Sequence, residues 1–412
     1  MDAITTRRGQ QLVEGGRRFA RKPGLAARFV APGLSKIIDR IDASLESGAI
    51  HASLPDGTRR VLGARAPGFE CHVDLRSWNA LVRLASNGSV GWYQAWAAGE
   101  WWSPDPVPLF ALFMQHASRL GDTARAKGLF RAALWLAHRV NRNTPAGAQK
   151  NIAAHYDLGN DFYAAWLDET MSYSSALSIT DAALFAAQQI KQDRIADRLG
   201  GAKRVLEIGC GWGSLAGRLA QRGAQVTAIS LSEEQLAWAR KHHSGIDFRK
   251  QDYRQVSGQF DGIASVEMVE ALGRENWPLF MDCIARSLEA GGRAAIQFIS
   301  MRDDLFDAYA ASADFIQAYV FPGGLLIRTS EFRRLAEERG LTWSDQVDFG
   351  MDYADTLKAW RVNFDAAVEE GRLPLGFDAT FVDLWRYYLM YCEGGFRGGG
   401  IDVHQVTLVK GE

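Results

Sequence analysis

Residues 204–210, which read RVLEIGC, decide the fold class. The run is short and almost continuously apolar, as expected of a parallel strand that is buried on both faces of a sheet. We predict a helix from about Gly213 to Arg222, a second strand at QVTAISL (225–231) and a second helix that begins near Ser232. Serine is a residue type that caps helix N-termini, and three Glu or Gln residues follow it in the first turn.

Two later segments, FDGIASVEM (260–268) and GGRAAIQFIS (291–300), have the same strand pattern. This alternation of strands and helices predicts an α/β fold with a doubly wound, Rossmann-like parallel sheet that helices cover on both faces. Ligands of such sheets bind at the carboxyl ends of the strands. We therefore expect a binding site in the loops that follow the first two strands.

The motif EIGCGWG (207–213) places glycines directly between the first strand and its helix. Glycine lets a backbone turn tightly and approach a ligand closely, as in sites for dinucleotides and for S-adenosylmethionine. Two features favour S-adenosylmethionine. Glu207 would repel a pyrophosphate but attract a cationic amino group, and the second strand lacks a terminal acidic residue for a dinucleotide ribose.

The predicted cofactor contacts follow the strand ends. Gln235 is the candidate partner of the ribose hydroxyls, and Asp252 and Tyr253 lie where a contact to adenine is expected. A dinucleotide site is the alternative that the glycine motif alone allows. The predicted cofactor set from this part of the chain is Glu207, Gly209, Cys210, Gly211, Gln235, Asp252 and Tyr253.

The N-terminal part of the chain has a different pattern. Residues 1–50 are predicted to be helical, and ASLPDGTRRVLG (52–63) contains a Pro-Asp-Gly turn followed by the alternation of a hairpin. The segment NRNTPAG (141–147) breaks the helix that is predicted before it. We therefore predict a smaller N-terminal α+β, lipid-associated domain over residues 1–145 and an S-adenosylmethionine-dependent catalytic domain over residues 146–412.

The net charge of −1 conceals two basic segments. Residues 1–40 contain nine Lys or Arg and three Asp or Glu, and residues 117–142 contain six basic residues and one acidic residue. Around residues 129–140 apolar side chains recur every three or four positions between arginines, which is typical of a basic amphipathic helix at an anionic membrane surface. A contact between domains, or within a homodimer, explains the same pattern equally well.

Several other classes of protein find no support in the sequence. The four cysteines form no close pairs, so we expect neither a disulfide framework nor a metal site. No apolar run approaches the roughly 20 residues of a spanning helix, and no signal-peptide pattern follows the basic N-terminus. The basic segments lack a motif that reads nucleic acid, so we expect no such partner. We expect a cytoplasmic protein that associates peripherally with the inner face of the membrane.

A longer series of motifs resembles the cyclopropane-fatty-acid synthase family, which includes the mycolic-acid methyltransferases. The resemblance covers about residues 145–410 and extends into the N-terminal part through GWYQAWAAGEWWSPD (91–105). The matching segments are HYDLGNDFYAAWLDETMSYSSA (155–176), DYRQVSGQFDGIASVEMVEALG (252–273), YVFPGGLL (319–326), FGMDYADTLKAWRVNF (349–364) and YCEGGFRGGGIDVHQVTLVK (391–410).

The resemblance implies an enzyme that transfers the methyl group of S-adenosylmethionine to a double-bond carbon of an unsaturated acyl chain in a phospholipid. It implies that Tyr173 and Ser174 contact the cofactor, that Ser230 and Leu231 lie around its ribose, and that Glu270 and Tyr353 belong to the active site. Methyl transfer leaves a carbocation on the chain, which Glu270 would stabilise before a base removes a proton. Proton loss from the new methyl group closes a cyclopropane, and other routes give branched or unsaturated chains.

Three positions depart from the family pattern. The usual Tyr-Ser-Cys ends in Ser175, the usual Phe-Glu-His reads Val269-Glu270-Ala271, and the histidine expected on a later strand is Gln297. In the family that histidine helps to hold a bicarbonate ion that acts as the base. Glutamine carries no charge and would hold an anion less well. We therefore expect altered proton removal and a methyl- or methylene-branched chain, or a methylated diene, rather than a cyclopropane.

The glutamine variant resembles the branch associated with tuberculostearic-type and furan fatty acids. That branch implies a partner, a flavin-dependent reductase that completes the product. A true cyclopropane synthase is the alternative within the family. A methyltransferase for a small soluble acceptor would turn over without phospholipid, and a lipid-binding module without activity is the alternative of another class. The glycine motif and Glu270 argue against the inactive module.

Overall fold

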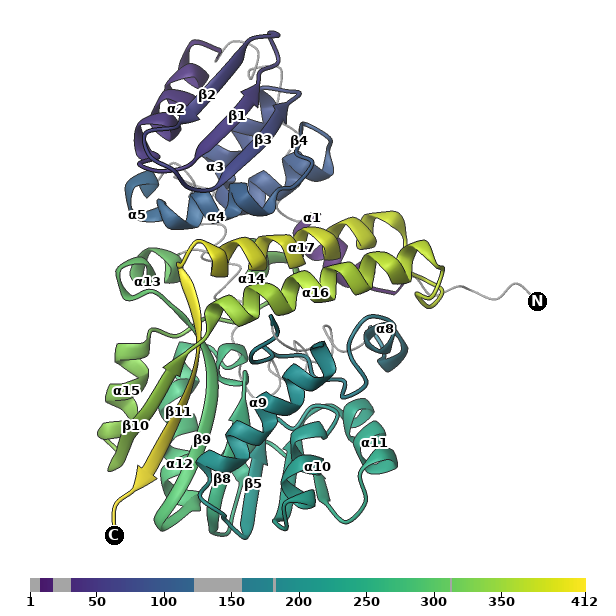
Figure 1. Cartoon of the computed structure of the whole chain (residues 1–412), viewed down its shortest axis with the longest axis vertical. Coiled ribbons are helices and arrows are strands. Elements are labelled where there is room, and N and C mark those ends of the chain that lie inside the picture. Colours follow the sequence, from purple (N-terminus) through teal and green to yellow (C-terminus); the bar gives the residue numbers. More distant parts are fainter. Residues whose placement is uncertain (1–7, 18–30, 122–157, 181–182, 312) are drawn as a thin grey trace, which may run out of the picture. The chain divides into compact units, whose positions relative to one another are not determined.

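The computed structural model describes residues 8–17, 31–121, 158–180, 183–311 and 313–412 (Figure 1). The chain forms two compact units, and neither is continuous in sequence. The first contains residues 1–141, 304–322 and 375–400, and the second contains residues 142–303, 323–374 and 401–412. The division predicted at residue 145 and the basic helix predicted around residues 129–140 lie outside the described residues.

The first unit contains a four-stranded sheet in the order β2-β1-β3-β4. Strands β1 and β2 are antiparallel and flank the predicted Pro-Asp-Gly turn, and β3 runs parallel to β1. Figure 1 shows α2 beside β2. The strands are β1 (Ala49–Ser53), β2 (Arg59–Gly63), β3 (Glu70–Leu75) and β4 (Trp101–Trp102). The helices are α1 (Gln10–Arg17), α2 (Ala31–Ser44), α3 (Asn79–Ala97), α4 (Val107–Gln115), α5 (Ala117–Leu120), α14 (Phe315–Tyr319) and α17 (Ala379–Arg397), together with α13 (Asp303–Ala310), which begins at the boundary between the units.

Aromatic side chains join three helices of the first unit. The ring of Tyr93 on α3 lies 4.9 Å from the ring of Phe315 on α14 and 4.9 Å from the ring of Tyr387 on α17. All three side chains are buried. Because α14 and α17 come from late segments of the chain, this contact explains why residues 304–322 and 375–400 belong to the first unit.

The second unit contains a seven-stranded sheet in the order β10-β11-β9-β8-β5-β6-β7. The pairs among β7, β6, β5, β8 and β9 are parallel. Four of the five residues of β5 are buried, as its apolar sequence predicts. The strands are β5 (Arg204–Ile208), β6 (Gln225–Ser230), β7 (Asp247–Lys250), β8 (Phe260–Val266), β9 (Leu288–Met301), β10 (Leu341–Asp348) and β11 (Ile401–Lys410).

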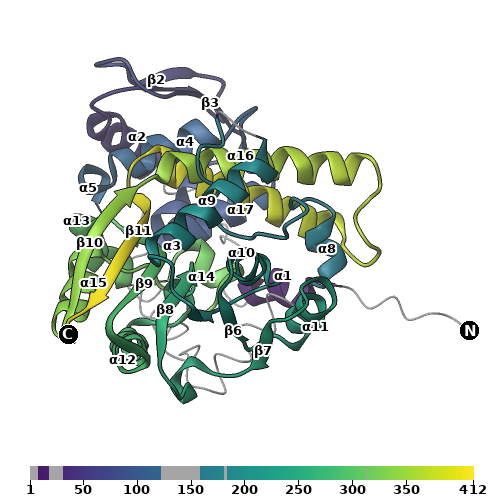
Figure 2. The ribbon, with the colours of Figure 1, turned by 60° about the horizontal axis from the view of Figure 1, so that its bottom comes forward.

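Helices cover both faces of this sheet. Figure 2 shows α9 above the strands and α12 beneath them. The predicted cap of α11 is present, because the Ser232 side chain accepts a hydrogen bond from the backbone N–H of Gln235. The helices are α8 (Asn160–Ala164), α9 (Leu184–Arg198), α10 (Ser214–Gln221), α11 (Glu233–His242), α12 (Trp277–Ser287), α15 (Thr329–Glu337) and α16 (Gly350–Glu369), with short 3₁₀ helices η3 (Tyr253–Gln255), η4 (Val269–Ala271) and η5 (Arg274–Asn276).

One edge of the sheet differs from a purely parallel arrangement. Strand β11 pairs antiparallel with both β9 and β10. Neither β10 nor β11 is among the predicted strands. Strand β11 mixes apolar residues with His404, Gln405 and Thr407, which are buried, so it lacks the apolar run expected of a buried strand. The register places Gln405 opposite Gln297 on β9. This edge therefore brings a second buried amide next to a predicted active-site residue.

Candidate active site

The turn after β5 depends on its glycines. Gly209, Gly211 and Gly213 have φ angles of 83°, 52° and 85°, which residues with a side chain rarely adopt. A Cβ atom on Gly209 would come within 2.9 Å of the Met268 side chain. The backbone N–H groups of Gly209 and Cys210 both donate to the carbonyl oxygen of Ile229 on β6, at 3.0 Å. The turn is thus fixed to the sheet while its inner side stays open to a ligand.

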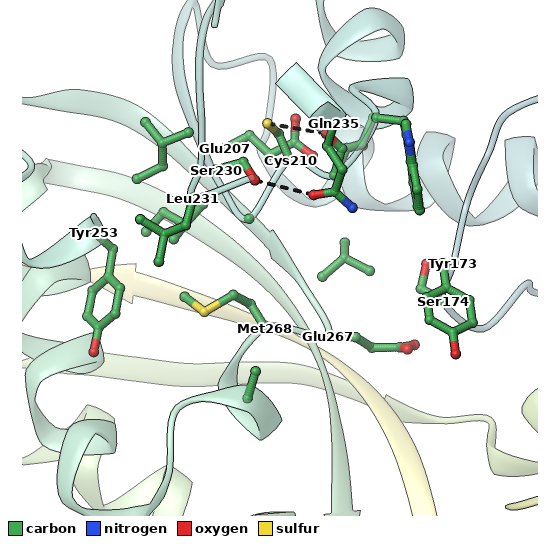
Figure 3. Close-up of a pocket in the computed structure, with 18 of the residues that line it drawn as sticks. Tyr173, Ser174, Glu207, Cys210, Ser230, Leu231, Gln235, Tyr253, Glu267 and Met268 are labelled. Atoms are coloured by element: carbon green, nitrogen blue, oxygen red, sulfur yellow. Dashed lines mark hydrogen bonds between the residues drawn. The ribbon is translucent and has the colours of Figure 1, made fainter. Parts of the chain in front are cut away.

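A pocket lies at the carboxyl ends of β5, β6 and β8, beside this turn. Figure 3 shows Tyr253 at one end of the pocket and Tyr173, Ser174 and Glu267 at the other. The structure brings together every residue that the sequence predicts to contact the cofactor. These pocket residues are Tyr173, Ser174, Glu207, Gly209, Cys210, Gly211, Ser230, Leu231, Gln235, Asp252 and Tyr253.

Polar side chains on β6 and α11 form one wall of the pocket. The Ser230 hydroxyl lies 3.4 Å from Gln235 Oε1, and it accepts a hydrogen bond from the backbone N–H of Ser232 at 3.2 Å. Gln235 is 4% exposed in spite of its polar side chain. These groups can exchange hydrogen bonds with ribose hydroxyls, as the sequence predicts.

Asp252 is engaged in a different contact. Its carboxylate accepts hydrogen bonds from Arg254 Nε at 2.9 Å and Arg254 Nη2 at 2.6 Å. Such a bidentate pair orients both side chains. The predicted contact to adenine is therefore expected from the ring of Tyr253, or from Asp252 and Arg254 acting together as a bonded pair.

Glu207 brings an incompletely paired carboxylate to the pocket. It lies on β5 and is 3% exposed. In the part of the chain that the structure describes, its Oε2 atom has no hydrogen-bond partner. Burial raises the pKa of Glu207 to about 8, against the opposing effects of the Ala216 backbone N–H and the Lys191 charge. A buried carboxylate beside a glycine turn fits the cationic amino group of the methionine part of S-adenosylmethionine.

Helix α9 supplies three buried polar side chains that the sequence analysis missed. Lys191 Nζ donates to the Ser174 hydroxyl at 2.6 Å, and Gln188 Nε2 donates to the Ser174 carbonyl at 2.9 Å. Gln192 Nε2 donates to the hydroxyls of Ser172 and Ser214, at 3.2 and 2.7 Å. These bonds hold the segment before Ser175 against the pocket. Their spacing of three and four residues, a polar stripe on one helix face, is the signal that could have identified them.

Lys191 is also the buried cation of this site. Burial lowers its pKa to about 8, although the charges of Glu267, Asp168 and Glu207 oppose that shift. An amine buried among carboxylates favours their ionised forms. Lys191 therefore balances part of the negative charge that surrounds the pocket.

The predicted catalytic residues converge on a carboxylate that the sequence analysis did not select. Glu267 Oε1 accepts hydrogen bonds from the Ser175 backbone N–H at 2.9 Å and from Gln297 Nε2 at 2.8 Å. Glu267 Oε2 accepts a hydrogen bond from the Tyr353 hydroxyl at 2.9 Å. Glu267 lines the pocket, whereas these three partners lie behind it.

Glu270 lies next to this cluster but outside the lining of the pocket. Its Oε1 atom accepts the backbone N–H of Ile299, and its Oε2 atom is buried without a partner among the described residues. Burial, together with the charge of Glu267, raises the pKa of Glu270 to about 8. Because Glu267 accepts more hydrogen bonds, it holds the negative charge of the pair and Glu270 holds the proton.

The residues present do not fit a bound bicarbonate. Gln297, which stands at the position of the family's histidine, and Tyr353 both donate to the Glu267 carboxylate. A second anion here would meet like charge in a buried setting and would lack a histidine cation.

Asp348, Asp402 and His404 form a separate polar cluster, with possible ligand atoms within 4.8 Å of one another. His404 Nδ1 lies 2.7 Å from Asp348 Oδ1, and its Nε2 lies 2.6 Å from the Ser300 hydroxyl. Asp402 Oδ1 accepts the backbone N–H of Gly350 at 2.8 Å. These bonds account for the cluster without a metal ion.

Comparison with known proteins agrees with this geometry. A family model described as mycolic acid cyclopropane synthetase matches residues 143–406. Tuberculostearic acid methyltransferase UfaA1 of Mycobacterium tuberculosis is 36% identical over 372 residues, which cover 84% of each chain. Cyclopropane-fatty-acyl-phospholipid synthase of Escherichia coli is 33% identical over 355 residues, which cover 82% of this chain and 88% of the relative.

A solved structure is similar to part of this chain. The mycolic acid cyclopropane synthase CmaA1, complexed with SAH and CTAB, aligns with a TM-score of 0.59 and 27% identity over 64% of this chain and 98% of that chain. These matches confirm the predicted fold class, a methyltransferase-type enzyme, and S-adenosylmethionine as its cofactor. The chain therefore belongs to the mycolic acid cyclopropane synthetase family.

Proposed function

We propose that the protein transfers the methyl group of S-adenosylmethionine to a double-bond carbon of an unsaturated acyl chain in a phospholipid. One observation supports this most: the pocket gathers all the predicted cofactor residues within a chain that aligns over 84% of its length with a tuberculostearic acid methyltransferase. S-adenosylmethionine supplies an electrophilic methyl group on a positively charged sulfur. The residues of the pocket bind and orient it.

The residues of the chain act mainly by positioning the two reactants and by stabilising the positive charge that forms on the acyl chain. An alkene is a weak nucleophile, so the reaction needs the double bond and the methyl group held in line with water excluded. Glu207 and the glycine turn would hold the methionine part, and Tyr253 would lie against the adenine. The negative charge of Glu267 lies at the pocket end that Tyr173 and Ser174 also line, where it would stabilise a carbocation on the acyl chain.

We propose a methyl- or methylene-branched product. The departure at Gln297 supports this, because the glutamine stands where the family has the histidine that helps to hold bicarbonate. A true cyclopropane is the other outcome, and the 33% identity to a cyclopropane-fatty-acyl-phospholipid synthase makes it worth testing. A branched chain that keeps a methylene group would then need a reductase, for which we propose a flavin-dependent partner.

Deuterium retention separates the products. Purified protein would be incubated with trideuteromethyl S-adenosylmethionine and vesicles of monounsaturated phospholipid, and the released acyl chains analysed by mass spectrometry and NMR. Two retained deuterium atoms mean that the new methyl group lost one deuteron to the base. NMR then separates an exocyclic methylene from a cyclopropane ring. Three retained deuterium atoms mean that the base removed a proton from a carbon of the acyl chain instead. A cyclopropane as the main product would contradict the branched product.

We also propose that the enzyme meets its substrate at the membrane surface. Among the described residues, no helix is long and apolar enough to span a bilayer. The basic residues Arg125, Lys127, Arg131 and Arg139 support electrostatic docking to anionic headgroups. Binding to anionic vesicles should weaken with added salt and when these four residues are changed to Glu. Binding that responds to neither change would contradict electrostatic docking.

A further inference from the structure

Glu267 has a backbone conformation that a glutamate rarely adopts. Its φ angle is 48°, in the left-handed region that favours glycine. A non-glycine residue held there is strained, and such residues cluster at active sites. Its backbone N–H donates to the Gln297 carbonyl oxygen at 2.8 Å, which fixes the strained residue to β9. The fold therefore keeps a carboxylate at a position where glycine would be relaxed.

The groups around Glu267 are arranged to hold an ionised carboxylate. The backbone N–H of Ser175 and the amide of Gln297 can only donate at the contacted atoms, and both donate to Oε1. Gln405 Nε2 donates to Gln297 Oε1 at 3.0 Å, so the Gln297 amide must turn its own NH₂ group toward Glu267. The orientation of Gln297 is thus set from the neighbouring strand.

The second carboxylate oxygen remains the more available one. Oε2 accepts a hydrogen bond only from the Tyr353 hydroxyl among the contacts of the described residues. Glu267 follows directly after β8, at the carboxyl edge of the sheet, and lines the pocket with Tyr173 and Ser174. Figure 3 shows its carboxylate directed toward these two residues. A basic oxygen therefore lies at the pocket end assigned to the reacting part of the cofactor.

We propose that Glu267 is the catalytic base of the reaction. This carboxylate of the chain itself removes the proton, whereas relatives that have the histidine use bicarbonate for the same step. This inference rests on the proposed function. Ser175, Gln297 and Tyr353 are then positioning residues that orient the carboxylate. The departure from the family pattern at Gln297 then has an explanation, because an internal carboxylate needs a neutral donor such as this amide rather than a cationic histidine.

The proton and electron balance of this step is complete without a further reactant. The π electrons of the double bond form a C–C bond to the donated methyl group, whose former bonding pair stays on sulfur. The neighbouring chain carbon becomes a cation, and a 1,2-hydride shift moves the charge to the carbon that bears the new methyl group. Glu267 takes a proton from that methyl group, and the released C–H pair forms the methylene double bond. Without the shift, the same proton loss closes a cyclopropane.

The environment suits a base of this kind. Burial raises the pKa of Glu267, against the opposing effects of the Ser175 N–H and the Lys191 charge. A raised pKa makes the carboxylate a stronger base toward the methyl proton. Glu270, which holds the proton of the carboxyl pair, leaves Glu267 ionised.

Two substitutions at one position test the assignment. Glu267→Gln keeps the shape and removes the base, and Glu267→Gly also relieves the left-handed backbone, so this variant should fold at least as well as the wild type. We expect each to lower methyl incorporation into monounsaturated phospholipid vesicles by about 100-fold or more. The dissociation constant for S-adenosylmethionine should stay within a few-fold of wild type. In Glu267→Gly, added formate or bicarbonate should restore part of the rate by occupying the vacated space.

The wild-type enzyme gives a test that needs no variant. Its turnover should be the same in carbonate-depleted buffer and in buffer with added bicarbonate. A wild-type rate that falls on depletion and returns with bicarbonate would overturn the assignment, as would wild-type turnover in Glu267→Gln. If the wild-type protein binds S-adenosylmethionine but labels no acyl chain under any condition, the proposed function itself fails.

Discussion

The pH dependence of cofactor binding follows from the buried Glu207. Its pKa is raised to about 8, whereas its ionised form is the one that pairs with the cationic amino group of S-adenosylmethionine. With this pKa, about 1% of unliganded molecules carry an ionised Glu207 at pH 6, and about half carry it at pH 8. Binding favours the ionised form and releases a proton, so affinity rises with pH. The rise is roughly 20-fold between these two values, because only about half of the cofactor amino groups still carry their charge at pH 8.

The rise should end near pH 8. An α-amino group has an ordinary pKa of about 7.7–8.0, so the cofactor loses its own charge above this range. Glu207→Gln keeps the shape but removes the titrating group, and it should weaken binding at pH 8 by about 10- to 150-fold, as expected when a charge-assisted contact is lost. Between pH 6 and pH 8 the affinity of this variant should be nearly constant.

Isothermal titration calorimetry at several pH values measures both quantities. Buffers with different ionisation enthalpies also count the protons that binding releases. Glu338→Gln is the matched control, because Glu338 forms an exposed i,i+4 pair with Arg334 outside the pocket. A wild-type affinity that does not change between pH 6 and pH 8, or a rise of equal size in Glu207→Gln, would refute the role of Glu207.

Gly209→Ala should weaken binding of S-adenosylmethionine by about tenfold or more, because a Cβ there strains a positive φ and meets a pocket side chain at 2.9 Å. Gly223→Ala, with a φ of 90° but open space around its Cβ, should not change the affinity in the same calorimetric assay. The wild-type melting temperature should fall between pH 6 and pH 9 by more than that of Glu270→Gln. The reason is that Glu270 has a pKa of about 8 in the folded protein and an ordinary value of 4.5 in the unfolded chain, so the folded state holds this proton more tightly. The stability gained in this way is fully present below pH 4.5 and is lost as the pH rises through 8. Lys191→Met should shift the rise in cofactor affinity to higher pH, because the Lys191 charge favours ionised Glu207.

The cofactor pocket could be predicted from sequence because its determinants are local. A buried strand, a glycine turn and a capped helix follow one another within residues 204–235, and each has its own pattern. Parallel strands then bring their carboxyl ends to one edge, so residues after β5 and β6 and those near Tyr253 meet without further information. Tyr173 and Ser174 precede the sheet, and only the family resemblance placed them there.

The base site could not be predicted in this way. Glu267 depends on hydrogen bonds from three residues that are far apart in sequence. These are Ser175 in a loop, Gln297 on β9 and Tyr353 on α16. Glu270 matches the glutamate of the family motif, and nothing local in the sequence distinguishes it from Glu267. The positive φ of one and the hydrogen-bond donors around it are properties of the folded chain.

The antiparallel edge and the discontinuous first unit have a similar explanation. Strand β11 contains buried polar residues that interrupt the apolar pattern, and their partners lie on β9 and β10. Residues 375–400 join the first unit through aromatic contacts such as the one between Tyr93 and Tyr387. Non-local packing of this kind leaves no periodic signal in the sequence itself.

Transfer of isotope from the cofactor into lipid tests the central claim most directly. The protein would be incubated with methyl-labelled S-adenosylmethionine and either monounsaturated or fully saturated phospholipid vesicles, and the acyl chains then analysed by mass spectrometry. We expect label in the unsaturated chains and none in the saturated ones. Protein that binds the cofactor yet leaves every acyl chain unlabelled, or labels a small soluble acceptor instead, would contradict lipid methylation.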